Sequence, residues 1–280
     1  MSSEALRLDS PERLPASRPV GSVQARRAGF ARDVASIAIR ALKALPREPA
    51  MMIPSLIIPV FFFAVNSGQL QDFAQNGIPG LDFRAFQLPS AIIFAVTGVS
   101  RAMALVTDIQ SGYFDRLLMT PMRRLALLLG LMVADFALVM TLILPVVALG
   151  VAVGVRFETG ILGAILFVLM GGLWGLAFTG FPYAIALKTG SPAAVGTSFL
   201  LFFPFAFLTT GTVPMEVLTG WMQAIARYNP VTYVLAALRS LLYGGWQPTA
   251  LLQGAIAIAI IGTISMSIAL AALRGRVTRG

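Results

Sequence analysis

The chain has 280 residues, of which 57% are hydrophobic and 12% charged, and its mean hydropathy is +0.82. In soluble domains about a quarter of all residues are charged. The low charged fraction therefore excludes an ordinary soluble domain and indicates an integral membrane protein. Cysteine and histidine are absent, which excludes a disulfide framework and removes the commonest metal ligand. The net charge of +9 favours attraction to anionic lipid headgroups over nucleic-acid binding, because the bilayer would leave no basic face free.

The N-terminal stretch, residues 1–25, is rich in arginine, proline and serine and has no apolar core. This composition predicts a flexible tail rather than a secretory signal. Residues 26–280 are predicted to form one membrane domain, since nearly everything beyond residue 50 is apolar run or short loop.

An amphipathic helix is predicted ahead of the first apolar run. Phe30, Val34 and Ile37 recur at steps of three and four, and Arg40 belongs to a basic cluster on the opposite face. We expect this helix to lie in the cytoplasmic interface of the membrane. It serves either as a simple anchor or also as a brace for a cytoplasmic partner.

Six apolar runs are candidates to cross a hydrocarbon core about 30 Å thick. In chain order they cover residues 51–65, 88–107, 125–155, 161–187, 192–213 and 249–273. The first is short and contains two prolines, which spans tolerate when neighbouring helices satisfy the freed backbone groups. The sequence therefore predicts an all-α integral membrane protein with six transmembrane helices.

Basic residues near the span ends predict the orientation of the chain. With six spans both termini share a side, and that side holds sixteen lysines and arginines against four on the other. The four are Arg84, Arg156, Arg227 and Arg239. Both termini are therefore predicted to be cytoplasmic. Only two of the 21 basic residues are lysine, a bias typical of GC-rich genomes, so we expect a bacterial inner membrane.

A polar stretch, DIQSGYFDRLLMTPMRR at residues 108–124, separates the second and third runs. Gly112 predicts a turn, and Pro121 ends the short helix that follows it. The apolar side chains of that helix share one face: Phe114, Leu117 and Leu118. We expect them to be exposed and to need a partner that covers them; an ordinary positively charged loop is the alternative.

Two segments resemble ABC-2 type transporter permeases. DIQSGYFDRLLMTPMRRLALLLG is similar to the family's coupling segment, in which an acidic residue, a glycine, an Asp/Glu-Arg-Leu core, a proline and a basic residue precede the third span. GWMQAIARYNPVTYVLAALRSLLYGG, residues 220–245, resembles the stretch between the fifth and sixth spans. The resemblance covers residues 25–275 and is nearest to the daunorubicin-resistance-type exporters. Asp108 stands where the family often has glutamate.

The resemblance implies that a cytoplasmic coupling helix docks this chain to a separate ABC ATPase. The residues implied are Asp108, Gly112, Phe114, Asp115, Arg116, Leu117, Leu118, Pro121 and Arg123. Family permeases work with two ATPase copies and a second permease chain, identical or a sister. ATP and Mg²⁺ are expected on the ATPase, because this chain has no G-x-x-x-x-G-K-[ST] phosphate loop. We therefore expect no enzymatic activity and no cofactor in the chain itself.

The outer stretch, residues 213–246, is predicted to hold two short helices with a break between them. The resemblance implies an extracellular re-entrant helical pair that caps the exit, represented by Trp221, Asn229, Pro230 and Tyr233. The alternative, compatible with the first, is a surface loop whose aromatic residues lie in the interfacial belt.

Arg101 and Asp135 stand inside the second and third apolar runs, where ionisable residues are costly and usually paired. We expect them to pair between the two spans. The alternative is an Arg101 side chain that extends to the cytoplasmic interface.

The fifth apolar run carries an aromatic stripe. Its residues are Phe199, Phe203 and Phe207, with Thr209 and Thr210 toward the outer end. In the family, spans two and five supply the central seam of a dimer, so the resemblance implies a translocation path for an apolar cargo here. Packing against lipid or neighbouring helices is the alternative.

We predict the permease subunit of a bacterial ABC exporter that moves a hydrophobic drug or lipid-like molecule out of the cytoplasm or inner leaflet. Export of a polysaccharide or lipid-linked glycan is the first alternative. A proton-coupled secondary transporter is disfavoured by the missing histidines and the single acid deep in a span. A membrane-embedded enzyme is disfavoured because H-E-x-x-H and paired carboxylates are missing.

Overall fold

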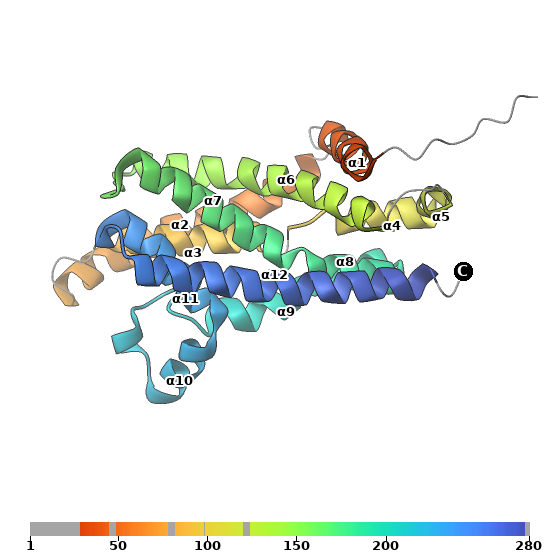
Figure 1. Ribbon diagram of the computed structural model, residues 1–280. Helices are drawn as coiled ribbons and strands as arrows, with labels where there is room; N and C mark the ends of the chain where they lie inside the picture. The colour runs from red at the N-terminus through yellow and green to blue at the C-terminus, as the bar shows by residue number, and fades with distance from the viewer. Residues whose placement is uncertain (1–28, 45–48, 78–81, 98, 120–123, 278–280) are drawn as a thin grey trace, which may run out of the picture.

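The computed structural model describes residues 29–44, 49–77, 82–97, 99–119 and 124–277. Within those ranges every regular element is a helix, and no strand occurs (Figure 1). The predicted tail, residues 1–25, lies outside the described residues. The predicted all-helical class is confirmed for the described part of the chain.

Three stretches of helix are long and apolar enough to cross a membrane: Leu125–Ala152, Gly160–Thr189 and Pro248–Arg276. They belong to α6 (Arg124–Ala152), to α7 (Gly160–Phe178) with α8 (Gly180–Thr189), and to α12 (Pro248–Val277). Length and composition therefore identify a membrane protein.

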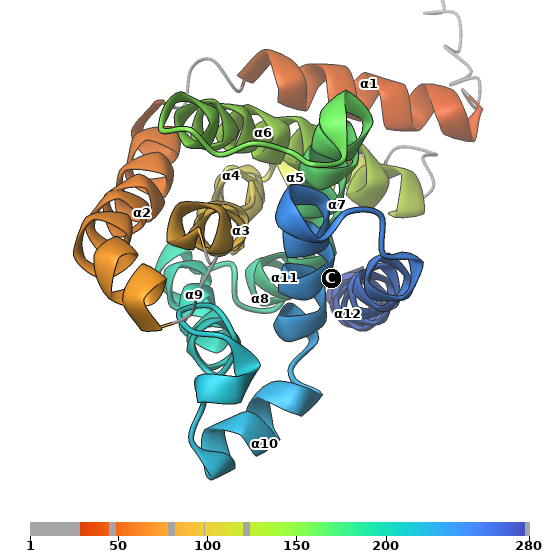
Figure 2. The ribbon, with the colours of Figure 1, turned by 90° about the vertical axis from the view of Figure 1, so that its left-hand side faces the viewer.

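Three shorter apolar helices accompany them: Ser55–Gln69 within α2 (Pro49–Gly77), α3 (Phe83–Val96) and α9 (Pro192–Phe207). Figure 2 looks along the bundle and shows α3 enclosed between α2, α6, α9 and α11 (Pro230–Arg239). This enclosure explains why nearly every side chain of α3 is buried.

The second apolar run differs from the prediction, which expected one helix over residues 88–107. The helix stops at Val96, and a separate helix, α4, runs from Ala102 to Gln110. Thr97 has extended backbone angles and ends α3. The Val-Thr-Gly-Val-Ser sequence at 96–100 concentrates β-branched residues and a glycine, which disfavour a continuous helix.

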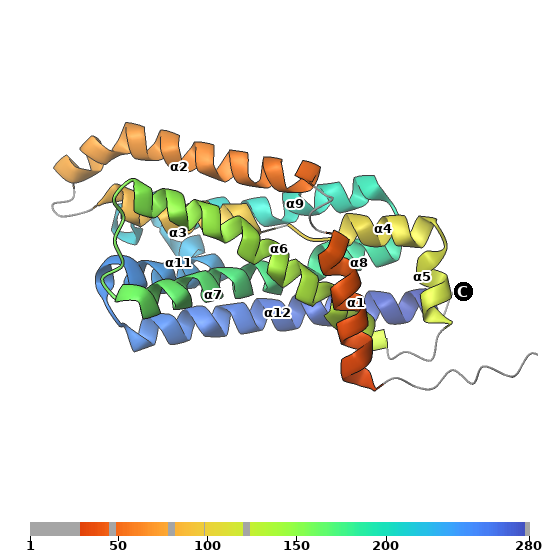
Figure 3. The ribbon, with the colours of Figure 1, turned by 90° about the horizontal axis from the view of Figure 1, so that it is seen from above.

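The predicted amphipathic helix is α1 (Phe30–Ala44), and it lies across α6 rather than along the bundle (Figure 3). Ile37 is buried against α6, Val34 is half-buried, and Arg40 and Phe30 are exposed. The close crossing depends on Gly130 of α6, where a Cβ atom would lie 2.6 Å from Cβ of Ile37. The helix thus packs on protein through its apolar face.

The two ends of the bundle carry different elements. α1, α4, α5 (Tyr113–Leu118) and the C-terminal end of α12 gather at one end, called here the inner end (Figures 1 and 3). α10 (Gly220–Tyr228) projects from the side of the bundle, close to the opposite or outer end (Figure 1). Buried apolar clusters fill both halves, one around Phe167 and Trp174 and one around Phe114 and Tyr183.

Candidate functional site

A tight hairpin joins α4 and α5 at the inner end. Gly112 connects the two helices with φ of +69°, a left-handed conformation that side chains other than glycine rarely adopt. α5 has six residues, and the amide of Met119 donates to the carbonyl of Asp115 at its end. The predicted turn and short helix are therefore present. Pro121 and Arg123, predicted to follow them, lie outside the described residues.

The exposure predicted for Phe114 is wrong. Only 2% of Phe114 is exposed, because its ring packs in the apolar cluster of the inner end together with Ile109 and Leu187. Leu117 is half-buried against the same cluster, and the side chain of Leu118 lies outside the described residues. An apolar helix face does not reveal whether its own bundle or another protein covers it.

The exposed face of α5 and the turn after it consist of other residues. Asp115 and Arg116 are exposed, and Met119 is 81% exposed. Phe114 thus anchors the helix, while a charged pair and a flexible methionine face outward.

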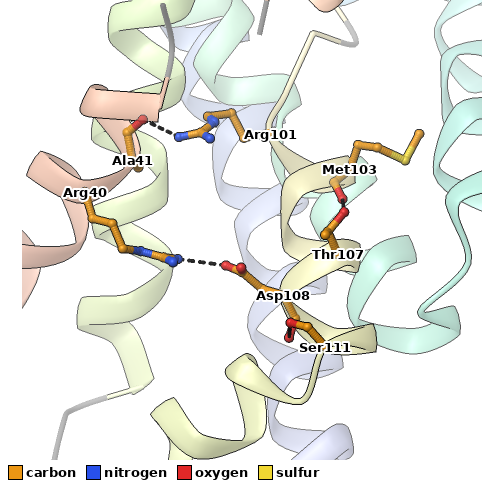
Figure 4. A network of polar contacts seen from close by, with 7 residues as sticks. All are labelled: Arg40, Ala41, Arg101, Met103, Thr107, Asp108 and Ser111. Carbon is orange, nitrogen blue, oxygen red and sulfur yellow. Dashed lines mark hydrogen bonds and ion pairs between the residues drawn. The ribbon is translucent and has the colours of Figure 1, made fainter. Parts of the chain in front are cut away.

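Arg40 connects α1 to both helices of the hairpin, and Figure 4 shows its ion pair with Asp108. Its Nη2 lies 2.7 Å from Oδ2 of Asp108 on α4, and its guanidinium carbon lies 4.5 Å from the ring centroid of Tyr113 on α5. The side chains of Arg40 and Asp108 are 47% and 28% exposed. Both residues were predicted as site residues, but no sequence periodicity predicts that they contact each other, because they are 68 positions apart.

Arg101 and Asp135 are also brought together, at the point where α4 begins. The backbone amide of Arg101 donates to Oδ1 of Asp135 at 2.9 Å, and both residues are buried. The guanidinium of Arg101 donates to the carbonyl of Ala41 on α1 (Figure 4). The Asp135 carboxylate lies at the N-terminus of α4, where the positive end of the helix dipole stabilises a negative charge. It also accepts a hydrogen bond from a backbone amide that the break between α3 and α4 leaves without a helical partner.

The predicted break in the outer stretch lies at Asn229 and Pro230, between α10 and α11. The Asn229 amide donates to the carbonyls of Phe205 and Leu208, each at 2.8 Å, and its side-chain oxygen accepts from the amide of Val231. Pro230 is the first residue of α11. Asn229 therefore caps α11 and holds it to the end of α9.

Two predicted aromatic residues of this stretch have different surroundings. The Tyr233 hydroxyl donates to the carbonyl of Arg227 at 2.6 Å, which ties α11 back to α10. Trp221 is 65% exposed, an arrangement compatible with an interfacial side chain.

Arg239 was predicted only as one of the four basic residues on the outer side, and no sequence pattern indicated its burial. It ends α11, is buried, and its guanidinium lies 3.5 Å from the ring centroid of Phe86. Its nitrogens donate to the carbonyls of Phe86, Thr210 and Gly211 and to the hydroxyls of Ser90 and Thr210. Burial lowers its pKa to about 10, so the group stays protonated at neutral pH.

A cavity of about 200 Å³ lies between α2, α3 and α9. Its aromatic residues are Phe62, Phe63, Phe94 and Phe207, and its polar residues include Asn66, Gln87, Ser90 and Thr212. An aromatic wall with a few polar groups is typical of a site for a largely apolar molecule.

The residues predicted to line a translocation path lie in different surroundings in the structure. Phe207 lines the cavity, and Phe203 stacks on it with 5.1 Å between ring centroids. Thr209 and Thr210 are buried; Thr210 accepts from Arg239, so its hydroxyl belongs to that network. The side chain of Phe199 lies outside the described residues. In the described ranges no three acidic residues gather as a metal site would require.

Comparison with known proteins assigns the class. A family model described as ABC-2 type transporter matches residues 32–243, most of the chain. The chain belongs to the ABC-2 type transporter family, and it is a membrane permease. The family predicted from the two motif segments is confirmed.

Its relatives include drug-resistance permeases. The chain is 28% identical over 212 residues to the daunorubicin resistance ABC transporter permease protein DrrB1 of Streptomyces coeruleorubidus, with 73% of each chain covered. It is 26% identical over 207 residues to a probable doxorubicin resistance ABC transporter permease protein DrrC of Mycobacterium tuberculosis, covering 74% of this chain and 75% of the relative. A putative transport permease ycf38 of Cyanophora paradoxa is 25% identical, covering 70% and 69%.

Proposed function

We propose that this chain is the permease subunit of a bacterial ABC exporter and moves a hydrophobic drug or lipid-like molecule outward. A separate ABC ATPase subunit, in two copies, supplies ATP hydrolysis and holds ATP and Mg²⁺. A second permease chain, identical or a sister, completes the transporter. The observation that carries the proposal is the hairpin of α4 and α5, whose buried Phe114 leaves the polar face of α5 free to bind a partner.

The proposed topology has six crossings with both termini in the cytoplasm. The crossing segments are α2, α3 with α4, α6, α7 with α8, α9, and α12. Placement of α1, α5 and the end of α12 at the inner end supports a common cytoplasmic side (Figure 1). α10 and α11 would form the extracellular re-entrant pair, since each has at most ten residues.

The proposed mechanism starts at α5. Movement of the ATPases displaces its exposed face, and the hairpin passes that displacement to α4. The break before Arg101 lets α4 tilt without carrying α3 with it, while Asp135 and Ala41 connect α4 to α6 and α1. Tilting these helices would open the cavity alternately to the two sides.

Size and lining of the cavity favour a compact apolar cargo. Four phenylalanines surround about 200 Å³, which suits part of a drug-sized molecule better than a glycan chain. The names of the relatives, which refer to daunorubicin and doxorubicin resistance, also support a hydrophobic drug as cargo.

The test combines the full chain with an ABC ATPase from the reading frame beside its gene, in lipid nanodiscs. We expect a complex with vanadate-sensitive ATPase activity. Arg116→Glu on the exposed face of α5 should weaken complex formation at least tenfold. Arg227→Glu is the matched control, because Arg227 is an exposed arginine on α10, far from α5 in the bundle (Figure 1). Equal effects of the two reversals, or no complex with the unmodified chain, would contradict the proposal.

A further inference from the structure

We propose that Gln87 on α3 is a specificity residue of the cavity between α2, α3 and α9, and that it favours apolar cargoes carrying a hydroxyl or N–H group. Its side-chain oxygen would accept a hydrogen bond from that group. Neutral and protonated groups both donate hydrogen bonds, so this selection does not require a charged cargo. The inference rests on the proposed function, because it specifies the cargo of the same permease.

Gln87 belongs to the face of α3 that lines the cavity. Ser90, Ala91 and Phe94 also line it, and the spacing of the four residues places them on one side of the helix. Only 6% of Gln87 is exposed, and its Oε1 has no hydrogen-bond partner among the described residues. A buried acceptor without a partner is costly, and an apolar side chain of similar size would avoid that cost. A donor group on the cargo would explain a glutamine at this position.

The neighbouring polar groups of the wall already have partners. The Ser90 hydroxyl donates to the Gly211 carbonyl at 2.7 Å. Both oxygens also accept from Nη2 of Arg239, each at 3.4 Å. Among the buried polar side chains that line the cavity, Gln87 therefore keeps an acceptor without a partner in the part of the chain that the structure describes.

Two further polar side chains of the wall are less enclosed. Asn66 is half-buried and Thr212 is exposed, so neither is confined to the cavity for its hydrogen-bond partners. A cargo that bonds to one of them exchanges one partner for another and gains little. A donor gains most at the buried oxygen of Gln87.

The aromatic residues of the wall do not discriminate in this way. Rings accept hydrogen bonds only weakly, so Phe94 and Phe207 offer the same apolar surface to cargoes with and without a donor. The two rings pack edge to face with 5.5 Å between centroids. A cargo without a donor would fill the cavity and leave the Gln87 oxygen buried and unpaired, and polar sites reject closely similar molecules most strongly in this situation.

The experiment measures binding of two neutral fluorescent probes, 2-naphthol and naphthalene, to the full chain in lipid nanodiscs. The probes differ in one hydroxyl group. The ratio of the naphthalene to the 2-naphthol dissociation constant is compared between variants, so that partition of each probe into the lipid cancels. In Gln87→Met, which has nearly the same length and lacks the amide oxygen, the ratio should fall at least about fivefold. A smaller fall, or no saturable binding of 2-naphthol to the unmodified chain, would overturn the inference.

Thr212→Val is the matched control, because it removes a hydroxyl group from the wall of the same cavity. It should leave the ratio within about twofold of the unmodified value, since the hydroxyl of Thr212 is not confined to the cavity. A larger fall in this variant would contradict the assignment to Gln87.

Thermal unfolding separates recognition of a cargo from a structural role. Gln87→Met removes a buried acceptor that has no partner among the described residues, so the unfolding temperature should stay unchanged or rise. A lower unfolding temperature, or a variant that does not fold, would assign Gln87 a structural role and contradict the inference. Failure of the ATPase complex test would instead contradict the proposed function, so the two failures are distinguishable.

Discussion

The inner and outer ends of this permease are held together in opposite ways. At the inner end, Arg40 joins α1 to the hairpin by one partly exposed ion pair and one contact with the Tyr113 ring. At the outer end, buried Arg239 donates five hydrogen bonds to α3 and to residues 210–211, and buried Asn229 donates two to the end of α9. Exposed ion pairs contribute little to stability, whereas buried polar networks are costly to disrupt.

The difference indicates which end can move. The contacts of Arg40 at the inner end are partly exposed, so they can break and reform while water solvates their partners. The outer contacts cannot break without leaving buried donors unsatisfied. A transporter driven from its cytoplasmic side would need a mobile inner end and a fixed outer end, because the driven helices have to move relative to a part that stays in place. The predictions below test the division, from the largest expected effect to the smallest.

Asp135→Asn tests the junction between the two regions, and we expect the largest loss of stability there. Asparagine can still accept from the Arg101 amide, but it removes a buried negative charge at the start of α4. Removing one partner of a buried charge arrangement costs about 3–5 kcal/mol. Thermal unfolding in lipid nanodiscs and ATP-driven transport measure the effect. Wild-type values for both would show that the charge is dispensable.

Asn229→Ala should weaken the outer end by about 2–3 kcal/mol, since it removes a helix cap and leaves buried carbonyl groups without donors. Asn229→Asp keeps the acceptor for the Val231 amide and loses both donors, so it should be no more stable than the alanine variant. Gln247→Ala, at an exposed residue of the same end, is the control. If it destabilises as much as Asn229→Ala, the outer end is not specially fixed.

Much of this arrangement could be predicted from sequence, where the signal is local. Hydropathy located the helices, Gly112 marked the hairpin, and Asn229 followed by Pro230 marked the break in the outer stretch. Each of these signals depends on the backbone preferences of a few neighbouring residues.

The rest depends on tertiary contacts. The apolar face of α5 gave no sign that Phe114 would turn into its own bundle. The run at 88–107 is long and mostly apolar, so hydropathy could not show that its helix would break and that a new helix would begin where the Arg101 amide donates to Asp135. No sequence pattern connects Arg239 with Ser90 and Thr210, so its burial and its hydrogen bonds could not be predicted.

Gly130→Ala should separate α1 from α6 at a cost of about 1–3 kcal/mol, typical of overpacking. The new methyl group would lie 2.6 and 2.7 Å from two carbons of Ile37 and 3.1 Å from the Val34 carbonyl. Adding Ile37→Ala should restore part of the contact by making room. The chain has no cysteine, so a nitroxide at Ala35→Cys labels α1 alone and reports its mobility. Gly196→Ala, where no atom lies within 4 Å, should leave that mobility unchanged.

The smallest effect on stability is expected for the ion pair of Arg40 and Asp108, and it is the sharpest test of the comparison. Arg40→Ala and Asp108→Asn should each change the free energy of unfolding by about 0.2–1 kcal/mol, because the pair is partly exposed. The same variants should lower ATP-driven transport several-fold, since α1 would no longer follow the hairpin.

The exchange variant Arg40→Asp with Asp108→Arg re-forms the pair but not the contact with Tyr113, so transport should recover only partly. A double-mutant cycle gives the coupling energy of the pair directly. A stability loss as large as that of Asn229→Ala would mean that the inner end is held as firmly as the outer end.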